Sequence, residues 1–344
     1  MSLLLICVGW DTLHYRVLRC AAAAGEVIVL GTPEAGWLAS SRDCARFIPA
    51  SWLSAPADLE RCASEIDRVA ASSGIRLVVP GDGRASRLLS QLQLRAACFP
   101  LPDHRTFDRL NDKWRFGELC RELGLRHPAT RLYASAEALH ADLAGGALLL
   151  PVVVKPTDRQ GGFGVRVIRS RQDAGLVRRL VYRPILAQAN VDGGDICLSA
   201  FCRGGRIAVD VVYRKRGGDC VFTASAELRQ MAGRLLEHVG YDGVVNFDAR
   251  LDRRGRIHLI ECNPRFWFTM DMTLLAGINF VRLGEGIGRA ARHATAGAVL
   301  RSNRSLLRAL GAPWTLTALD LKTLRFRLRD PVPVLHELLD RLRR

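Results

Sequence analysis

A pair of acidic residues stands in the apolar segment VVNFDARLDRRGRIHLIECNPRFW, which has the pattern of a β-hairpin. Strands over residues 244–252 and 257–263 would be joined by a tight two-residue loop at 254–255. This register places Asp248 directly opposite Glu261, so that two carboxylates face each other across the strands. Such a pair repels unless a cation lies between its members, and the segment therefore predicts a cation site.

Asn263 completes this candidate site, because side chains two positions apart in a strand share a face. Carboxylate and amide oxygens are hard ligands, and Mg²⁺ commonly takes one or two carboxylates together with substrate phosphates. The alternative is a solvated hairpin with a chance acidic pair. The apolar neighbours of Glu261 in IHLIEC disfavour that alternative, since they indicate a face that is not exposed.

A second candidate site is the stretch VVVKPTDRQGGFGV, in which Lys155 ends an apolar strand shortly before the Gly-Gly-Phe-Gly loop at 161–164. A lysine at a strand end can direct its ammonium at a phosphate, and a glycine loop can fold its backbone N–H groups over an anion. Phe163 could cover such a site against water. A plain hairpin turn remains the alternative. The order of lysine and glycines disfavours a protein-kinase loop, and the absence of GK[ST] excludes a P-loop.

A third candidate site is the apolar strand at 184–191, which carries Gln188, loosens at Gly193-Gly194 and resumes with Asp195. A strand edge can offer backbone groups to an adenine, and a carboxylate can bind a ribose diol. A simple pair of strands is the alternative.

Arginine supplies 46 of the 50 basic residues, and lysine occurs only at positions 113, 155, 215 and 322. The net charge of +16 raises the hypothesis of nucleic-acid binding. The arginines are spread over the whole chain without a dense block or a known nucleic-acid motif, so solvated surfaces are the favoured interpretation. The few positions that are lysine and not arginine are therefore expected to be sites that need a compact point charge. Lys215 is the exception, since it falls at a predicted hairpin tip and is expected to be solvated.

The bulk composition indicates a cytoplasmic α/β protein with reduced cysteines. The chain has 344 residues with 49% hydrophobic content, and its ten cysteines form no CxxC pair. No stretch reaches the roughly 18 uncharged apolar residues that span a bilayer. The first residues lack a basic region before their apolar run, so they are expected to form a strand and a helix and not a signal peptide.

The first third of the chain alternates predicted strands and helices, which indicates a doubly wound parallel sheet. The predicted strands are 3–9, 26–32 and 75–82, and the predicted helices are 12–25 and 56–74. No GxGxxG motif follows the first strand, and this argues against a dinucleotide-binding site here. The turns after the strands, near Trp10, Asp11 and Asp82, still lie where such sheets bind ligands.

The rest of the chain predicts a helix at 106–124, capped by Thr106 and ended by Gly124, and then a series of short strands. Glycine turns between the strands favour antiparallel pairing. The predicted strands are 165–168, 184–191, 196–203, 206–213, 219–224, 243–251 and 256–262, with a helix at 225–239. The last ~45 residues are arginine-rich and are expected to be helical.

In this order, the segments NDKWRFGELCRELGLRHPATRL, VVVKPTDRQGGFGV, ILAQANVDGGD and FDARLDRRGRIHLIECNPR resemble the ATP-grasp superfamily over nearly the whole chain. The resemblance implies an α/β plus α+β fold, in which a doubly wound parallel-sheet domain precedes a two-lobed ATP-grasp domain. The implied parts are an N-terminal domain at 1–100, a small-lobe region with lead-in helix and glycine loop at 101–183, a large lobe with the magnesium site at 184–300 and a C-terminal helical extension at 301–344.

The resemblance also assigns roles to single residues, with ATP and Mg²⁺, or Mn²⁺ in its place, as cofactors. The implied nucleotide contacts are Lys113, Lys155, Gly161, Gly162, Phe163, Gly164, Gln188, Val191 and Asp195, and the implied metal ligands are Asp248, Glu261 and Asn263. Lys155 and Arg265 are the implied catalytic residues, with Arg250 as a weaker candidate. Two positions depart from the family pattern: Ala189 stands where a glutamate is common, and Asp195 is shorter than the usual glutamate.

The activity implied by the resemblance is ligation of a small-molecule carboxylate to an amine through an acylphosphate. Two alternatives stay open, a carbamoyl-phosphate-synthetase-like use of bicarbonate and a nucleotide-binding module without catalysis. The substrates are expected near Trp10-Asp11, Asp82 and the segment 266–271, with no nucleic-acid or membrane partner. The C-terminal helices leave two further alternatives, a contact in a homodimer or an acidic substrate.

Overall fold

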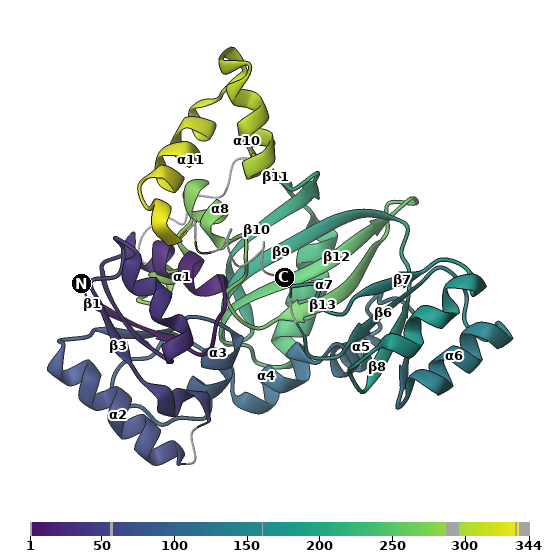
Figure 1. Ribbon diagram of the computed structural model, residues 1–344, viewed down its shortest axis with the longest axis horizontal. Coiled ribbons are helices and arrows are strands. Elements are labelled where there is room, and N and C mark those ends of the chain that lie inside the picture. The colour runs from purple at the N-terminus through teal and green to yellow at the C-terminus, as the bar shows by residue number, and fades with distance from the viewer. Residues whose placement is uncertain (1, 56–57, 160, 287–295, 334–335, 337–344) are drawn as a thin grey trace.

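The computed structural model of the chain contains three β-sheets that lie side by side, with helices around them (Figure 1). It describes residues 2–55, 58–159, 161–286, 296–333 and 336, with the backbone alone at position 303. The parts of the predicted C-terminal helices at 334–335 and 337–344, and part of the expected large lobe at 287–295, lie outside the described residues.

The N-terminal sheet is parallel, as the alternation of strands and helices predicted, and its strand order is β3-β2-β1-β4. Alternate residues of the central strand enter different cores, since successive side chains point to opposite faces. Leu3 and Leu5 pack with helix α1, whereas Leu4 and Ile6 pack with helices α2 and α3. The elements of this part are β1 (Ser2–Cys7), α1 (Leu13–Ala22), β2 (Glu26–Gly31), η1 (Pro33–Ser40), β3 (Arg46–Pro49), η2 (Ser51–Ser54), α2 (Leu59–Ser72), β4 (Leu77–Pro80) and α3 (Gly83–Leu89).

The predicted single helix at 106–124 is wrong, because two helices, α4 (His104–Asn111) and α5 (Lys113–Glu122), occupy this segment. Asp112 interrupts the helical backbone with an extended conformation (φ −77°, ψ 119°). Its side chain accepts hydrogen bonds from the backbone N–H groups at 114 and 115, which would otherwise lack partners at the start of α5. Asp103, and not Thr106, caps α4 in the same way.

A small antiparallel sheet follows, with the strand order β5-β8-β6-β7. Strand β8 follows η3 in the chain but lies between β5 and β6 in this sheet. The small sheet therefore extends beyond residue 183. Helix α6 and the 3₁₀ segment η3 pack against each other beside it. The elements are β5 (Thr130–Tyr133), α6 (Ala136–Gly145), β6 (Val152–Pro156), β7 (Arg166–Ile168), η3 (Arg171–Arg179) and β8 (Ile185–Ala189).

The large sheet has six antiparallel strands in the order β13-β12-β9-β10-β11-β14. One of its faces packs with α5 and α7, and the other shares a core with α1, α8 and α9. Phe99 joins the N-terminal part to this second core by ring contacts with Phe201 and Phe266. The elements are β9 (Gly193–Arg203), β10 (Arg206–Arg216), β11 (Asp219–Thr223), α7 (Ala226–His238), β12 (Gly243–Asp252), β13 (Ile257–Asn263), α8 (Met270–Leu275), α9 (Phe280–Leu283) and β14 (Val299–Leu300).

The C-terminal helices α10 (Asn303–Leu310) and α11 (Ala318–Leu328), with η4 (Pro313–Thr315) between them, rise from the body as a helical hairpin (Figure 1, yellow). A buried polar network fastens the end of this hairpin to the N-terminal part. Arg19 pairs with Asp43 at 2.6 Å, and the Asp330 carboxylate accepts a hydrogen bond from the Ser41 hydroxyl at 2.5 Å. The Tyr15 hydroxyl donates to the backbone carbonyl of Asp330 at 2.9 Å.

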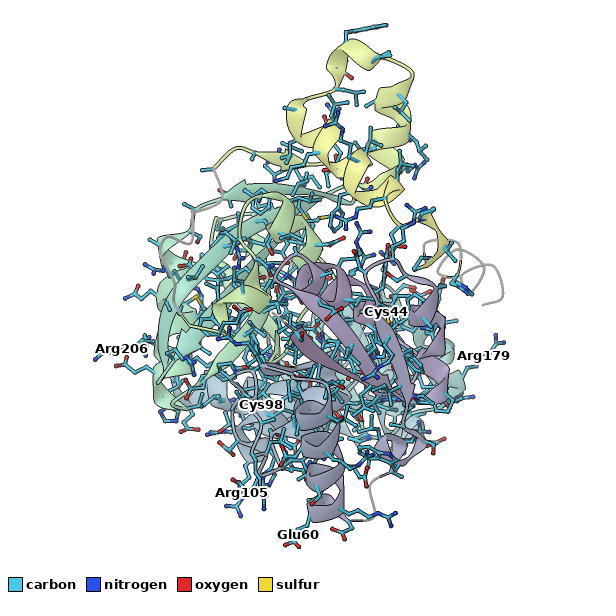
Figure 2. All side chains as sticks on the ribbon, turned by 90° about the vertical axis from the view of Figure 1, so that its left-hand side faces the viewer. Cys44, Glu60, Cys98, Arg105, Arg179 and Arg206 are labelled. Atoms are coloured by element: carbon cyan, nitrogen blue, oxygen red, sulfur yellow. The ribbon has the colours of Figure 1, made fainter. Side chains whose placement is uncertain are left out.

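The arginines are distributed over the surface, as the composition predicted. Arg105, Arg179 and Arg206 point outward from three separate parts of the molecule (Figure 2). All ten cysteines are free thiols, and most are buried. Within the described ranges, no helix combines the length and the apolar character needed to cross a membrane.

Candidate active site

The small and the large sheet together line a cavity of about 510 Å³. All of the predicted nucleotide, metal and catalytic residues except Gly164 line it, although they come from segments far apart in the chain. The predicted residues in its wall are Lys113, Lys155, Gly161, Gly162, Phe163, Gln188, Val191, Asp195, Asp248, Glu261, Asn263 and Arg265.

Asp248 and Glu261 are paired directly across strands β12 and β13, as the hairpin pattern predicted. The predicted loop is wrong, however. Leu251 pairs with Ile257 and Asp252 closes the turn onto Arg256, so three residues and not two form the loop. A β-bulge at Ile260 adds one residue to β13 and restores the pairing of the two carboxylates.

Four side chains surround the Asp248 carboxylate. Its Oδ1 accepts from Lys215 Nζ at 3.1 Å and from the Cys197 thiol at 3.0 Å. Its Oδ2 accepts from Asn263 Nδ2 at 3.1 Å and from Asn246 Nδ2 at 3.3 Å. Burial opposes ionisation of this carboxyl, but the Lys215 ammonium, the hydrogen bond from Cys197 and the Arg265 guanidinium together hold the pKa of Asp248 below its ordinary value. The site therefore keeps this acid ionised.

The donor set fits a hard divalent cation. Two carboxylates face each other, each beside a lysine, since Lys113 Nζ lies 3.5 Å from Glu261 Oε2. The Asn263 carbonyl oxygen accepts from Arg265 at 2.8 Å, so the amide must rotate before this oxygen can reach a metal ion. Among the described residues no group of three or more His, Cys, Asp or Glu side chains can hold a metal. A cation here would thus take its other ligands from phosphates and water.

Lys155 is buried beneath the cavity, where its ammonium donates to Gln188 Oε1 at 3.0 Å. Burial lowers the pKa of Lys155 from the ordinary 10.5 to about 8; the Glu261 carboxylate opposes this shift and the Lys113 ammonium adds to it. Gln188 also contacts His127 and Thr130, and it is 2% exposed. The Gln188 side chain therefore holds the Lys155 ammonium in position. The sequence did not predict this contact.

The glycine loop is the turn between the antiparallel strands β6 and β7. Gly161, Gly162 and Gly164 have φ values of 68°, 74° and 74°, which only glycine adopts without strain. Lys113 Nζ donates to the carbonyl of Arg159 at 2.7 Å and so ties the root of the loop to helix α5. Phe163 is 56% exposed at its tip. The loop is thus anchored at its base and open above the cavity.

Asp195, predicted to bind a ribose, is engaged by an arginine in this structure. Arg250 Nη1 lies 2.6 Å from Asp195 Oδ1, and the same guanidinium donates to the carbonyls of Gly193 and Val191. Arg250 therefore shapes the segment between β8 and β9, and a ribose hydroxyl at Asp195 would have to share the carboxylate with it.

Arg265 lies where the first cavity meets a second one of about 1060 Å³, which reaches the N-terminal sheet. Its side chain is 4% exposed and donates to Asn263 Oδ1 and to the carbonyl of Phe266. Burial lowers the pKa of Arg265, and the nearby carboxylates of Asp11, Glu261 and Asp82 oppose this effect. Both the N-terminal part and the large sheet thus act on this guanidinium.

The second cavity contains some of the residues predicted to contact substrates. Trp10, Asp11 and Phe268 line it. Asp82 does not, because its buried carboxylate holds His14 at 2.9 Å and caps helix α3. Asp271 pairs with Arg16, which lines the cavity, at 2.8 Å.

Lys215 is exposed beside a hairpin turn, as predicted, but the sequence did not indicate its contact with Asp248. Strand β10 extends to Arg216, and Lys215 points from it to Asp248. Burial lowers the pKa of Lys215, but the Asp248 carboxylate and Cys197 together raise it above its ordinary value. The scarcity of lysine was the signal, because three of the four lysines line this one cavity. Asn246, Cys197 and His127 had no comparable signal.

Comparison of the sequence with known families places residues 181–296 in a family described as "ATP-grasp in the biosynthetic pathway with Ter operon". The chain is 24% identical to D-aspartate ligase of Enterococcus faecium over 238 residues, which cover 60% of this chain and 56% of the ligase. It is 29% identical to the arginine-specific large chain of carbamoyl phosphate synthase of Geobacillus stearothermophilus over 176 residues, 46% of this chain and 16% of the synthase. The chain thus matches only part of the length of either relative.

Solved structures with the same fold include an L-amino acid ligase from Bacillus licheniformis. Its TM-score is 0.59 at 17% identity, and the match covers 82% of this chain and 72% of the ligase. N5-carboxyaminoimidazole synthetase from Staphylococcus aureus has a TM-score of 0.59 at 14% identity, with 82% of this chain and 76% of the synthetase covered. At these identities the likeness shows the fold.

Proposed function

Because the chain belongs to the ATP-grasp superfamily, we propose that it is an ATP-dependent ligase that joins a small-molecule carboxylate to an amine. One observation carries the proposal. A single cavity gathers three lysines, two facing carboxylates and a buried arginine, and a second cavity large enough for a substrate meets it at that arginine. We take the chain to be organised as an N-terminal domain at 1–100, a small lobe that begins at 101 and includes strand β8, a large lobe that follows this strand up to 300, and a C-terminal extension.

The first cavity would hold ATP. Lys113 of helix α5 and Lys155 of strand β6 line this cavity and would contact the phosphates of ATP, and the loop at 161–164 would fold over these phosphates. Val191 and Asp195 would hold the adenine and the ribose at the strand edge. Gln188 would act mainly by keeping the Lys155 ammonium in place.

Asp248, Glu261 and Asn263 would hold Mg²⁺, with Mn²⁺ as a substitute of similar ligand preference. When bound, such an ion would neutralise part of the negative charge on the phosphates of ATP. Lys113 and Lys215 already stand beside the two carboxylates and would contribute positive charge from the protein itself.

The carboxylate substrate would lie against Arg265 at the junction of the two cavities. Its oxygen attacks the γ-phosphorus of ATP, the bond to the bridging oxygen breaks, and ADP leaves. The amine then attacks the acyl carbon, inorganic phosphate leaves with the bonding electrons, and the amine proton passes to solvent. Arg265 would hold the carboxylate and then the oxyanion of the tetrahedral intermediate. Closure of the glycine loop would exclude water from the acylphosphate.

The test is ADP release from Mg·ATP with a panel of carboxylates, each with and without an amine pool, for the wild type and Glu261→Ala. Asp67→Ala provides a matched control, because Asp67 is a carboxylate on helix α2 outside both cavities. Release that needs both acid and amine, persists in the control and is lost in Glu261→Ala supports the ligase. Absence of magnesium-dependent ATP binding in the wild type would refute the proposal.

Bicarbonate is a second candidate for the carboxylate, because the chain is similar in sequence to a carbamoyl phosphate synthase large chain. Bicarbonate-dependent ADP release without any other acid would favour it. Magnesium-dependent ATP binding with no release for any acid would instead favour a binding module. We place the reaction in the cytoplasm, where ten free thiols stay reduced.

A further inference from the structure

The larger cavity contains an arginine, Arg84, whose guanidinium has no hydrogen-bond or ion-pair partner among the residues that the structure describes. Arg84 lies on helix α3 and lines this cavity. Two other cavity arginines are occupied. Arg16 pairs with Asp271 at 2.8 Å, and Arg87 holds Asp108 by two hydrogen bonds of 2.6 and 2.9 Å.

The backbone beside Arg84 is adapted to its position. Gly9 follows strand β1, and a Cβ atom at this residue would lie 2.5 Å from Arg84 Nη1. Any larger residue there would displace the guanidinium. Arg84 therefore lies across the turn after β1, at the carboxyl end of the parallel sheet, where sheets of this kind bind ligands.

Arg84 and Arg265 line the same cavity, Arg84 from helix α3 of the N-terminal part and Arg265 from the segment that follows strand β13. The carboxylates of Asp11 and Asp82, which neighbour Gly9 and Arg84 in the chain, are close enough to act on Arg265. The cavity wall also includes the side chains of Trp10 and Phe268. The cavity thus offers two cationic groups, which come from two different parts of the chain, and aromatic surface in its wall.

The acidic residues of the cavity restrict the kind of molecule that it can bind. Asp11 and Asp158 also line it. They disfavour a molecule that is anionic along its whole length, and they favour one whose negative charges lie only at its two ends. The volume of about 1060 Å³ exceeds what a molecule as small as bicarbonate needs.

We propose that the carboxylate substrate carries a second anionic group, a carboxylate or a phosphate, at the end remote from its reacting group, and that Arg84 binds this group. The inference rests on the proposed function, which puts the reacting carboxylate at Arg265. Arg84 is then a residue that determines specificity, because it selects substrates by their far end and takes no part in the transfer itself.

The experiment is calorimetric binding of matched acids to the full-length protein with Mg·ADP present. Succinate, glutarate and adipate are compared with butyrate, valerate and hexanoate, and 4-phosphonobutyrate tests a phosphate-like end. Arg84→Gln removes the proposed contact. Arg105→Gln is the matched control, because Arg105 is exposed and points away from the body (Figure 2), so it loses the same charge outside the cavity.

We expect at least one diacid to bind roughly 10- to 100-fold more tightly than its monoacid, as a charge-assisted contact to arginine provides. Arg84→Gln should abolish this preference and leave monoacid binding unchanged, while Arg105→Gln should retain it. Preference for the phosphonate alone would identify the second group as a phosphate. Equal binding of diacids and monoacids by the wild type, or a preference that persists in Arg84→Gln, would overturn the inference.

Measurements of acid binding and of ADP release distinguish the proposed anion site at Arg84 from the proposed ligase activity. ADP release with monoacids as readily as with diacids would retain the ligase and reject the role of Arg84. A diacid preference that depends on Arg84, in a protein that releases no ADP with any acid, would retain the anion site and reject the ligase.

Discussion

Raising the pH from about 7 to about 9 is expected to weaken the binding of Mg·ATP about tenfold, because Lys155 loses its proton over this range. The pKa of Lys155 is lowered by burial to about 8. At about pH 7 some nine-tenths of the molecules carry the ammonium that the phosphates require, and at about pH 9 roughly one tenth do. Bound phosphates favour the ammonium and raise its pKa again, so binding takes up a proton above pH 8. The affinity must therefore fall as the pH rises.

Calorimetric titration with a non-hydrolysable ATP analogue, in buffers of different ionisation enthalpy, measures both the affinity and the proton uptake. Lys155→Arg should bind with little change over the same range, because a guanidinium stays charged. Lys322→Arg is the matched control, since Lys322 is an exposed lysine outside the cavity and its replacement should leave the wild-type profile intact. A wild-type affinity that is constant between about pH 7 and about pH 9 would refute this account of Lys155, as would an unchanged profile in Lys155→Arg.

Three further predictions concern the sheets that hold the site. Lys215→Met removes a cation that lowers the pKa of Asp248. On acidification, the variant should therefore lose the stability that ionised Asp248 contributes at a higher pH than the wild type does. An acid denaturation curve identical to that of the wild type would contradict this ion pair. Gly193→Ala should destabilise the protein by about 2 kcal/mol or more in urea unfolding, because its Cβ would lie 1.9 Å from the carbonyl of Leu251, whereas Gly194→Ala, with nothing within 4 Å, should change stability by less than about 0.5 kcal/mol. Phe247→Ala should cost about 3–5 kcal/mol by the same measurement, since this ring is fully buried between β12 and helix α5.

Local sequence patterns predicted the elements and the pairing of Asp248 with Glu261, because period-two alternation and turn residues act over a few positions. The same reasoning failed at Asp112, where one capping side chain divided the predicted helix. Hydrophobic periodicity continues through such a cap and so conceals it. The β-bulge at Ile260 was hidden for a similar reason, since one inserted residue compensated a loop that was one residue longer than predicted.

The position of Lys215 could not be derived from local patterns, because it depends on the order of strands in the large sheet. Strand β9 lies between β10 and β12, and Cys197 of β9 pairs with Tyr213 on one side and with Asp248 on the other. Lys215 stands two residues beyond Tyr213 on the same face, which brings its ammonium diagonally across to Asp248. A sequence records no such order of strands. The ion pair between Arg250 and Asp195 depends on the same order of strands, because Arg250 of β12 lies directly opposite Asp195 of β9.

The buried network at the base of the C-terminal hairpin has a consequence for the timing of folding. Tyr15 and Ser41 leave the ribosome long before their partner Asp330, which is made some 300 residues later. Chains fold in large part as they are synthesised, with the N-terminal part first. The parallel sheet can therefore assemble early, while Arg19 can reach Asp43 but not yet the carbonyl of Phe326, to which it also donates. The face of α1 that receives the hairpin therefore remains open until Asp330 has been made, which is well after the parallel sheet can assemble.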